Sequence, residues 1–279
     1  MRNVPWASHF VDLSGIRTHY VESGEAGAPT LVLLHGGGAG ADSVGNWRQA
    51  MPLLARDFRV LAMDLVGFGQ TGKPDPSQYA YSQQDRNAHL AEFITALGLE
   101  PAILVGNSMG GATALGVAME QPDLVRALVL MGSAGLNARI TESLKPIVYY
   151  DFTRAGMERL VAALTAPGFK ADEELIDRRY ELSVEPDTRL AYQATMKWIQ
   201  DQGGLFYPED ALRTVTAPTL VVNGKDDRVV PLANAFRMLE LLRNSWGYIL
   251  PHCGHWAMIE APQDFALATR DFVLSKVLA

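Results

Sequence analysis

The stretch LVGNSMGGATALGVAMEQP, residues 104–122, decides the fold of this chain. An apolar run ends at Gly106, one serine follows, and a run of helix formers begins directly after it. Gly106-Asn107-Ser108-Met109-Gly110 fits G-x-S-x-G, a strand-turn-helix corner that raises the serine hydroxyl above a sheet. The alternative is a tight turn in a structural or nucleotide-binding protein, so the meaning of Ser108 depends on the partners it has elsewhere.

Strands and helices alternate on both sides of this corner, at the spacing of a parallel, doubly wound sheet. A hairpin around a Ser-Gly pair is expected over residues 10–22. Buried strands are expected within six short apolar segments: 30–40, 58–71, 101–107, 125–135, 217–227 and 246–255. Helices are expected over 47–57, 81–99, 108–121, 232–243 and from about Asp264.

This rhythm breaks between residues 137 and 206, which are rich in helix formers and show no clear buried strand. A helical insertion in a continuous sheet is most simply a lid over the carboxyl end of the strands, where ligands bind in this class of fold. We therefore predict a core formed by residues 1–136 and 207–279 and a lid formed by residues 137–206.

Composition excludes several classes of protein. The 279 residues carry a formal net charge of −7 without a basic cluster, so we expect no nucleic-acid or membrane partner. Cys253 is the single cysteine, which fits a reducing compartment. Residues 1–10 lack the pattern of a signal peptide and no apolar run is long enough to span a membrane, so a cytoplasmic protein is predicted. No metal cluster or cofactor fingerprint occurs, and we expect neither.

A serine nucleophile needs a base and an acid that orients the base. His255 follows the last predicted strand and is the expected base, whereas His252 lies nearer the strand and is expected to pack. The expected acid is Asp227, which follows the strand before the last one. It lies at the usual offset in Gly224-x-x-Asp227, and Asp226 is the alternative. The chain order Ser, Asp, His is that of an α/β-hydrolase fold.

Stabilisation of an oxyanion needs backbone N–H groups near the serine. The glycine-rich segment HGGGAG, residues 35–40, follows an early strand and supplies one donor, which we assign to Gly37. Met109, directly after the nucleophile, supplies the second. A phosphate cradle is the alternative for this segment, but the dinucleotide-binding and P-loop spacings are absent.

Four segments together resemble the meta-cleavage product hydrolases, the carbon–carbon bond hydrolases of aromatic-compound degradation. They are HGGGAG (35–40), GNSMGGATAL (106–115), GKDDRVVP (224–231) and CGHWAMIE (253–260). Within that family the chain is most similar to carbazole-pathway enzymes, through ESLKPIVYYDFTR (142–154) and WIQDQGGLFY (198–207). The resemblance covers nearly the whole chain, and the elbow paired with Gly-His-Trp is its most specific part.

The resemblance implies a 2-hydroxy-6-oxohexa-2,4-dienoate substrate with an aryl or alkyl group at C6. Hydrolysis of its C5–C6 bond gives 2-hydroxypenta-2,4-dienoate and a carboxylic acid. The dienol is first ketonised so that a carbon leaving group becomes a stabilised dienolate, and a route through a gem-diol stays open. Members of the family are commonly homo-oligomers, so a dimer or a larger oligomer is expected.

The same resemblance assigns the residues that bind the dienoate. Arg179 matches the arginine that holds it, although composition alone leaves Arg178 equally plausible. Asn46 and Asn107 match polar positions that donate to it, with a helix cap as the alternative for Asn46. The remaining substrate contacts expected are Trp256, whose wall and core roles are hard to separate, and Gly38.

Aromatic residues of the lid either shape the pocket for the C6 substituent or form ordinary lid core: Tyr149, Tyr150, Phe152, Trp198 and Phe206. The triad also suits a serine esterase or amidase on the same scaffold, and a ligand receptor built on a hydrolase fold is a more remote alternative. Dehalogenases and most epoxide hydrolases of this fold use an aspartate where Ser108 stands.

Overall fold

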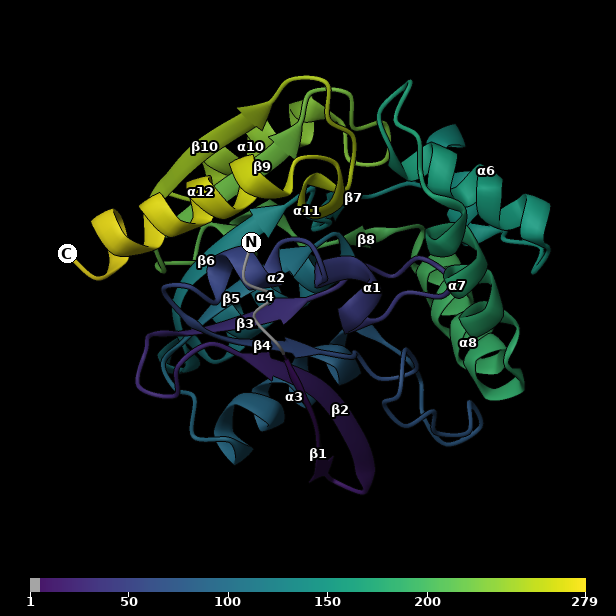
Figure 1. The fold of residues 1–279 in the computed structure, drawn as a ribbon, viewed down its shortest axis with the longest axis horizontal. Helices are drawn as coiled ribbons and strands as arrows, with labels where there is room; N and C mark the ends of the chain where they lie inside the picture. Colours follow the sequence, from purple (N-terminus) through teal and green to yellow (C-terminus); the bar gives the residue numbers. More distant parts are fainter. Residues whose placement is uncertain (1–5) are drawn as a thin grey trace.

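The computed structural model describes residues 6–279 and is built on an eight-stranded sheet, with the strand order β1-β2-β4-β3-β5-β6-β9-β10 (Figure 1). The strands are β1 (Ala7–Leu13), β2 (Ile16–Ser23), β3 (Thr30–Leu34), β4 (Arg59–Met63), β5 (Ala102–Asn107), β6 (Val125–Met131), β9 (Thr219–Gly224) and β10 (Ser245–Leu250). The β1–β2 and β2–β4 pairs are antiparallel, and every other pair is parallel. This sheet confirms the predicted α/β-hydrolase fold.

The parallel register brings the functional segments to one edge of the sheet. Leu34 on β3 pairs with Gly106 on β5, which in turn pairs with Leu130 on β6. The strands β3, β4, β5 and β6 are almost entirely buried, because apolar side chains point to both faces of a sheet that is covered on both sides. The glycine-rich loop, Ser108 and the Asp227 loop therefore leave the sheet at neighbouring positions.

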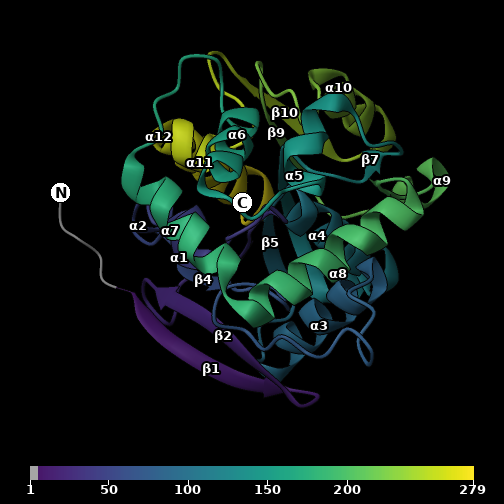
Figure 2. The same cartoon turned by 90° about the vertical axis from the view of Figure 1, so that its right-hand side faces the viewer.

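Helices cover both faces of the sheet, as the side view shows (Figure 2). One face carries α1 (Ser43–Trp47), α2 (Met51–Leu54), α11 (Ala257–Glu260) and α12 (Pro262–Phe272), and the other carries α3 (Gln83–Ala96), α4 (Met109–Glu120), α9 (Glu209–Leu212) and α10 (Leu232–Leu241). The prediction of one helix over residues 47–57 is wrong, since α1 and α2 are separate. Pro52 lies in the first turn of α2, where proline is tolerated, but its ring would break a helix continuing from α1.

Between Leu136 and Phe206 the chain forms four α-helices and a small two-stranded sheet. The helices are α5 (Lys145–Val148), α6 (Arg154–Leu164), α7 (Glu173–Val184) and α8 (Pro186–Gln202). The strands β7 (Leu136–Asn137) and β8 (Leu205–Phe206) pair antiparallel where this segment leaves and rejoins the core. Figure 1 shows α6, α7 and α8 at one end of the sheet, as expected for a lid. The lid boundaries at 137 and 206 stay a prediction.

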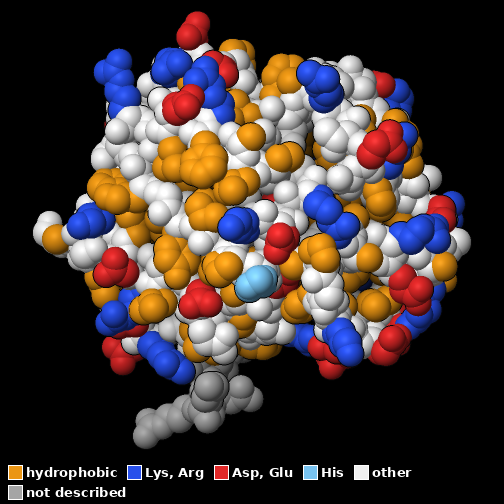
Figure 3. Space-filling view, turned by 90° about the horizontal axis from the view of Figure 1, so that it is seen from above, with side chains coloured by type: hydrophobic (Ala, Val, Ile, Leu, Met, Phe, Trp, Pro, Cys, Tyr) orange, Lys and Arg blue, Asp and Glu red, His pale blue; other side chains and the backbone are white. Residues whose placement is uncertain are grey.

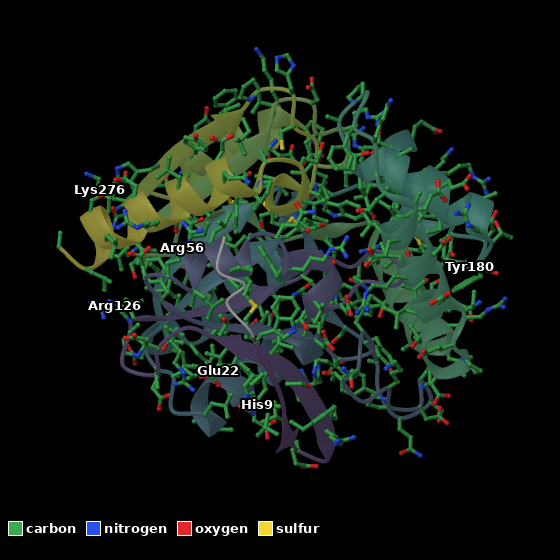
Figure 4. All side chains as sticks on the ribbon, viewed as in Figure 1. His9, Glu22, Arg56, Arg126, Tyr180 and Lys276 are labelled. Atoms are coloured by element: carbon green, nitrogen blue, oxygen red, sulfur yellow. The ribbon has the colours of Figure 1, made fainter. Side chains whose placement is uncertain are left out.

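The surface carries mixed charge. From above, acidic and basic side chains are interspersed with apolar ones (Figure 3). Figure 4 shows Arg56, Arg126 and Lys276 spread along the side away from the lid, and Tyr180 on the lid itself. Within residues 6–279, no helix is both long enough and apolar enough to cross a membrane. The prediction about a signal peptide rests partly on residues 1–5, which lie outside the described residues.

Candidate active site

Ser108 occupies the sharp corner between β5 and α4. Its backbone has φ 55° and ψ −117°, a conformation that non-glycine residues rarely adopt. The corner is held by hydrogen bonds from the Ser108 N–H to the Met131 carbonyl at 3.2 Å and from the Ala134 N–H to the Ser108 carbonyl at 3.0 Å. A methyl group on Gly106 or Gly110 would lie within 2.6 Å of backbone atoms, so both positions require glycine.

The structure brings His255 and Asp227 together. The imidazole Nδ1 of His255 lies 2.7 Å from Asp227 Oδ2, and both side chains are buried. The other oxygen, Asp227 Oδ1, accepts the N–H groups of Val229 and Val230 at 2.8 Å each, which fixes the carboxylate. His255 Nε2 is buried without a hydrogen-bond partner among residues 6–279, and His255 and Ser108 line the same cavity. This is the arrangement of a base whose second nitrogen is free for a hydroxyl proton.

The alternatives for the base and the acid lie elsewhere. His252 is exposed and has φ 52°, so the expectation that it packs in the interior is wrong. It lies in the turn directly after β10, with its backbone in the left-handed region. Asp226 is partly exposed and uses its backbone N–H to bond the Cys253 carbonyl at 2.9 Å. Neither residue lines the cavity that contains Ser108.

Glu260 holds the loop that carries His255, a function that the sequence analysis missed. Its carboxylate accepts the N–H groups of Gly254 at 3.1 Å, Trp256 at 3.2 Å and Ala166 at 2.7 Å. Ala166 follows α6, so one carboxylate joins the histidine loop to the lid. Burial raises the pKa of Glu260 despite these three bonds. The His255 N–H adds a further link by donating to the Leu164 carbonyl at 2.8 Å.

The glycine-rich loop after β3 lies beside Ser108. Gly36, Gly37 and Gly38 all line the cavity, and so does Met109, the first residue of α4, whose N–H has no partner within its helix. His35 fixes the start of this loop. Its Nε2 accepts the Leu65 N–H at 3.0 Å, so its Nδ1 carries the proton and donates to the Gly36 carbonyl at 2.8 Å. Burial lowers the pKa of His35, which keeps it in this neutral form.

Arg179 and Arg178 occupy different environments, although both lie on α7. Arg178 is partly exposed and forms an ion pair with Asp42, the residue that caps α1. Arg179 is buried and lines the cavity, and it forms no ion pair with any described residue. Its Nη1 donates to Asn46 Oδ1 at 3.3 Å, its Nε has no partner, and its Cζ lies 4.8 Å from the centre of the Trp256 ring.

A buried guanidinium without a carboxylate partner is costly, because burial removes water from a charge that nothing neutralises. Burial lowers the pKa of Arg179 to about 10, so it stays protonated at neutral pH. The glycines of the loop after β3 allow Arg179 to lie close to the loop backbone. A methyl group on Gly38 would lie 3.0 Å from Arg179 Nη2, and one on Gly40, where φ is +65°, would lie 1.9 Å from the Arg179 carbonyl oxygen. The site is therefore built to receive an anion.

Both asparagines make hydrogen bonds within the protein. Asn46 is not a helix cap, because Asp42 caps α1 by accepting the Gly45 N–H, and Asn46 instead accepts from Arg179. The donation from Asn107 to a substrate stays a prediction, and it would compete with two hydrogen bonds that the amide already makes. Its Nδ2 already donates to the Met131 carbonyl at 3.0 Å and the His255 carbonyl at 3.2 Å. Asn107 lines the cavity but ties β6 and the histidine loop to the elbow.

The rest of the cavity wall is mostly aliphatic, which the sequence analysis did not anticipate. It consists of Ile140, Leu144, Ile147, Val148, Leu164, Met196, Ile199, Leu205, Val229 and Val230, with Ala134, Asn137 and Gly204. None of the five lid aromatics named from the sequence lines it. Tyr150 and Phe152 instead pack on each other with ring centres 4.9 Å apart, as lid core, and Tyr149 and Phe206 are exposed. Trp256 is buried and does line the cavity.

Comparison with known proteins places this geometry in a family. Residues 29–262 match the family model described as alpha/beta hydrolase fold. The chain is 55% identical to a 2-hydroxy-6-oxo-6-(2'-aminophenyl)hexa-2,4-dienoic acid hydrolase of Metapseudomonas resinovorans, with 96% of this chain and 91% of that protein aligned. The chain belongs to the meta-cleavage product hydrolases.

Further relatives are similar over nearly the whole chain. A 2-hydroxymuconate semialdehyde hydrolase of Pseudomonas sp. (strain CF600) is 35% identical over 98% of this chain and 95% of its own length. A crystal structure of a serine hydrolase involved in carbazole degradation superposes with a TM-score of 0.89, at 52% identity, over 97% of this chain and 99% of that one. This meta-cleavage product hydrolase thus shares the architecture of that solved structure over 97% of its chain.

The described part of the chain holds no group of three or more His, Cys, Asp or Glu side chains arranged to bind a metal ion. The polar side chains that line the cavity are those of Asn46, Asn107, Ser108, Arg179 and His255, with Asn137 as the one that the sequence analysis did not name.

Proposed function

We propose that this meta-cleavage product hydrolase cleaves the C5–C6 bond of a 2-hydroxy-6-oxohexa-2,4-dienoate with an aryl group at C6. The products are 2-hydroxypenta-2,4-dienoate and a carboxylic acid. The observation that carries the proposal is Arg179, a buried cation without a carboxylate partner among residues 6–279, on the wall of the cavity that contains Ser108. A simple ester needs no such group, whereas a dienoate brings a carboxylate that a guanidinium holds with two hydrogen bonds.

Binding comes first in the proposed mechanism. The substrate carboxylate and its 2-oxygen lie against Arg179, which Asn46 and the Trp256 ring hold in place. The C6 substituent lies among the aliphatic side chains of the lid. This places the C6 carbonyl between Ser108 and the N–H groups of Gly37 and Met109.

Ketonisation then prepares a carbon leaving group. A proton moves from the 2-hydroxyl to C5, with His255 as the shuttle, and the dienol becomes a 2,6-diketone. His255 next takes the proton of Ser108, whose oxygen attacks C6. Collapse of the tetrahedral intermediate breaks the C5–C6 bond, and its electron pair flows through the C3–C4 double bond onto the 2-oxygen. Arg179 stabilises the resulting dienolate. The 2-oxygen of the dienolate then takes the proton that His255 holds, which gives 2-hydroxypenta-2,4-dienoate and returns His255 to its neutral form.

Water completes the cycle by attacking the acyl group on Ser108, again with His255 as general base. Asp227 orients the imidazole and stabilises its charge through the 2.7 Å contact. The route through direct attack of water and a gem-diol differs in that no bond forms to Ser108.

A direct assay tests the proposal. Purified protein is mixed with 2-hydroxy-6-oxo-6-phenylhexa-2,4-dienoate, and the loss of its visible absorbance is followed beside an aryl-ester control. We expect rapid loss with benzoate formed in equal amount. Hydrolysis of the ester with persistence of the dienoate would instead make the protein an esterase and remove the role of Arg179.

We also propose that the enzyme works in the cytoplasm as a homo-oligomer. A single buried cysteine supports a reducing compartment. Exposed apolar side chains beside the edge strand β10, those of Trp246 and Leu267, support association. Light scattering after size-exclusion chromatography should give at least twice the 30.4 kDa of one chain, and a monomer across the working concentration range would contradict this.

A further inference from the structure

Asn137 stands out among the residues that line the cavity. It lies on β7, and the chain from there to Val148 forms one wall of the cavity through Ile140, Leu144, Ile147 and Val148. All of these neighbours are aliphatic, so they offer a substituent nothing but apolar contact. Asn137 is the single polar side chain on that wall.

The amide of Asn137 has one free group. Its Nδ2 donates to the Val229 carbonyl at 3.4 Å, whereas its Oδ1 is buried with no hydrogen-bond partner among the described residues. The orientation of the amide follows from this contact, because the reverse orientation would bring two oxygen atoms together. A buried acceptor without a partner is destabilising, and such groups persist where a ligand completes them.

Asn137 is also held firmly in place. Its backbone pairs with Leu205 across the β7–β8 sheet. Its partner Val229 is fixed in turn, since the Val229 N–H donates to Asp227 Oδ1 at 2.8 Å. The free oxygen of Asn137 is thus positioned relative to the predicted catalytic acid, as a specificity group must be.

We propose that Asn137 determines specificity by accepting a hydrogen bond from a donor substituent, an amino or hydroxyl group, on the C6 aryl ring. The inference rests on the proposed function. An amino group on the ring would satisfy Oδ1, whereas an unsubstituted phenyl group leaves the buried oxygen without a partner. A site that accepts a hydrogen bond from a substrate group discriminates against the analogous substrate without that group.

The test compares two substrates, the dienoates with 2-aminophenyl and with phenyl at C6, on the wild type and on Asn137→Leu. We expect Asn137→Leu to lower kcat/KM for the aminophenyl substrate by about tenfold or more while the phenyl substrate is cleaved at least as well as before. Ile147→Val is the matched control, because it changes the same wall without removing an acceptor. It should affect both substrates by the same factor.

The outcomes separate this inference from the proposed function. If the wild type cleaves both dienoates and Asn137→Leu changes them equally, the role of Asn137 is wrong and the proposed function stands. If the wild type cleaves neither, the proposed function fails and the inference fails with it. Thermal unfolding of each variant identifies a loss that comes from misfolding, which would lower both activities together.

Discussion

Ser108 shows most clearly how one residue combines strain and function. Its φ of 55° is unfavourable for any residue with a side chain, by about 1–3 kcal/mol, and neighbouring hydrogen bonds and two tightly packed glycines keep it there. The strain is tolerated because the same corner places the hydroxyl at the start of α4, where N–H groups of the helix are unpaired.

Ser108→Ala is therefore expected to fold normally and to lose activity. Turnover of the dienoate should fall by about 10⁴-fold or more, because no other nucleophile lies at the corner. Binding should persist, since Arg179 is unchanged, and a spectrum of the dienoate mixed with excess variant would show it. Substantial residual turnover would favour the gem-diol route and remove Ser108 as the nucleophile.

At the residue scale, the sequence predicted those site residues that lie on recognisable motifs. Ser108 and His255 lie on segments with fixed spacing, and their cavity and partners agree with the roles predicted for them. The sequence alone could not decide whether Arg179 or Arg178 binds the substrate; only the family resemblance did so. A usable signal was the helical spacing of α7, which places Arg179 on the buried face. The residues of that face are Leu175, Ile176, Arg179 and Ser183. Asn137 has no such signal, because its importance comes from a missing partner.

Among the elements, the loop between β10 and α11 depends on one carboxylate. Glu260 satisfies three backbone N–H groups, and Glu260→Ala leaves all three without an acceptor. We expect a loss of about 2–4 kcal/mol in the free energy of unfolding and a fall in kcat of about tenfold, because His255 loses its position. Urea denaturation and steady-state kinetics measure the two effects.

Glu181→Ala is the matched control, since Glu181 is an exposed glutamate on α7. It should leave both quantities unchanged. A Glu260→Ala variant with normal stability and normal kcat would show that the loop is held by its remaining contacts, such as the 2.8 Å bond from His255 N–H to Leu164.

Elements with a strong local pattern were predicted well, and those set by tertiary contacts were not. The β1–β2 hairpin turns at Ser14 and Gly15, both with positive φ, as the Ser-Gly pair indicates. The strands β7 and β8 have only two residues each. This is too short to show the alternation of apolar and polar residues that predicts a strand, so only their pairing in the structure defines them. The split between α1 and α2 follows from Pro52, a signal present in the sequence but not used.

For the molecule as a whole, we expect acid stability to depend on a histidine in the core. His89 on α3 lies 2.8 Å from the Thr18 hydroxyl, and burial lowers its pKa to about 4. Between about pH 6.5 and pH 4 the unfolded chain therefore binds a proton that the folded protein does not. This group stabilises the fold above pH 6.5, and the stabilisation, about 3 kcal/mol at most, is lost as the pH falls to 4.

His89→Gln is expected to remove this part of the pH dependence. The free energies of unfolding of the wild type and the variant, measured by urea denaturation from pH 7.5 to pH 4, should converge or cross as the pH falls. Parallel curves over this interval would show that His89 keeps an ordinary pKa in the folded protein.

The proposed active site combines residues from the core and from the predicted lid. Ser108, His255 and Asp227 come from the edge of the sheet, and Arg179 comes from the lid helix α7. The comparison of Arg179→Gln with Arg178→Gln tests this account most directly, with kcat/KM measured for the phenyl dienoate and for an aryl ester. Arg179→Gln should lower the dienoate value by about 100-fold and leave the ester value within about threefold, and Arg178→Gln should change neither. An equal loss of both activities in Arg179→Gln, or an unchanged dienoate value, would contradict the account.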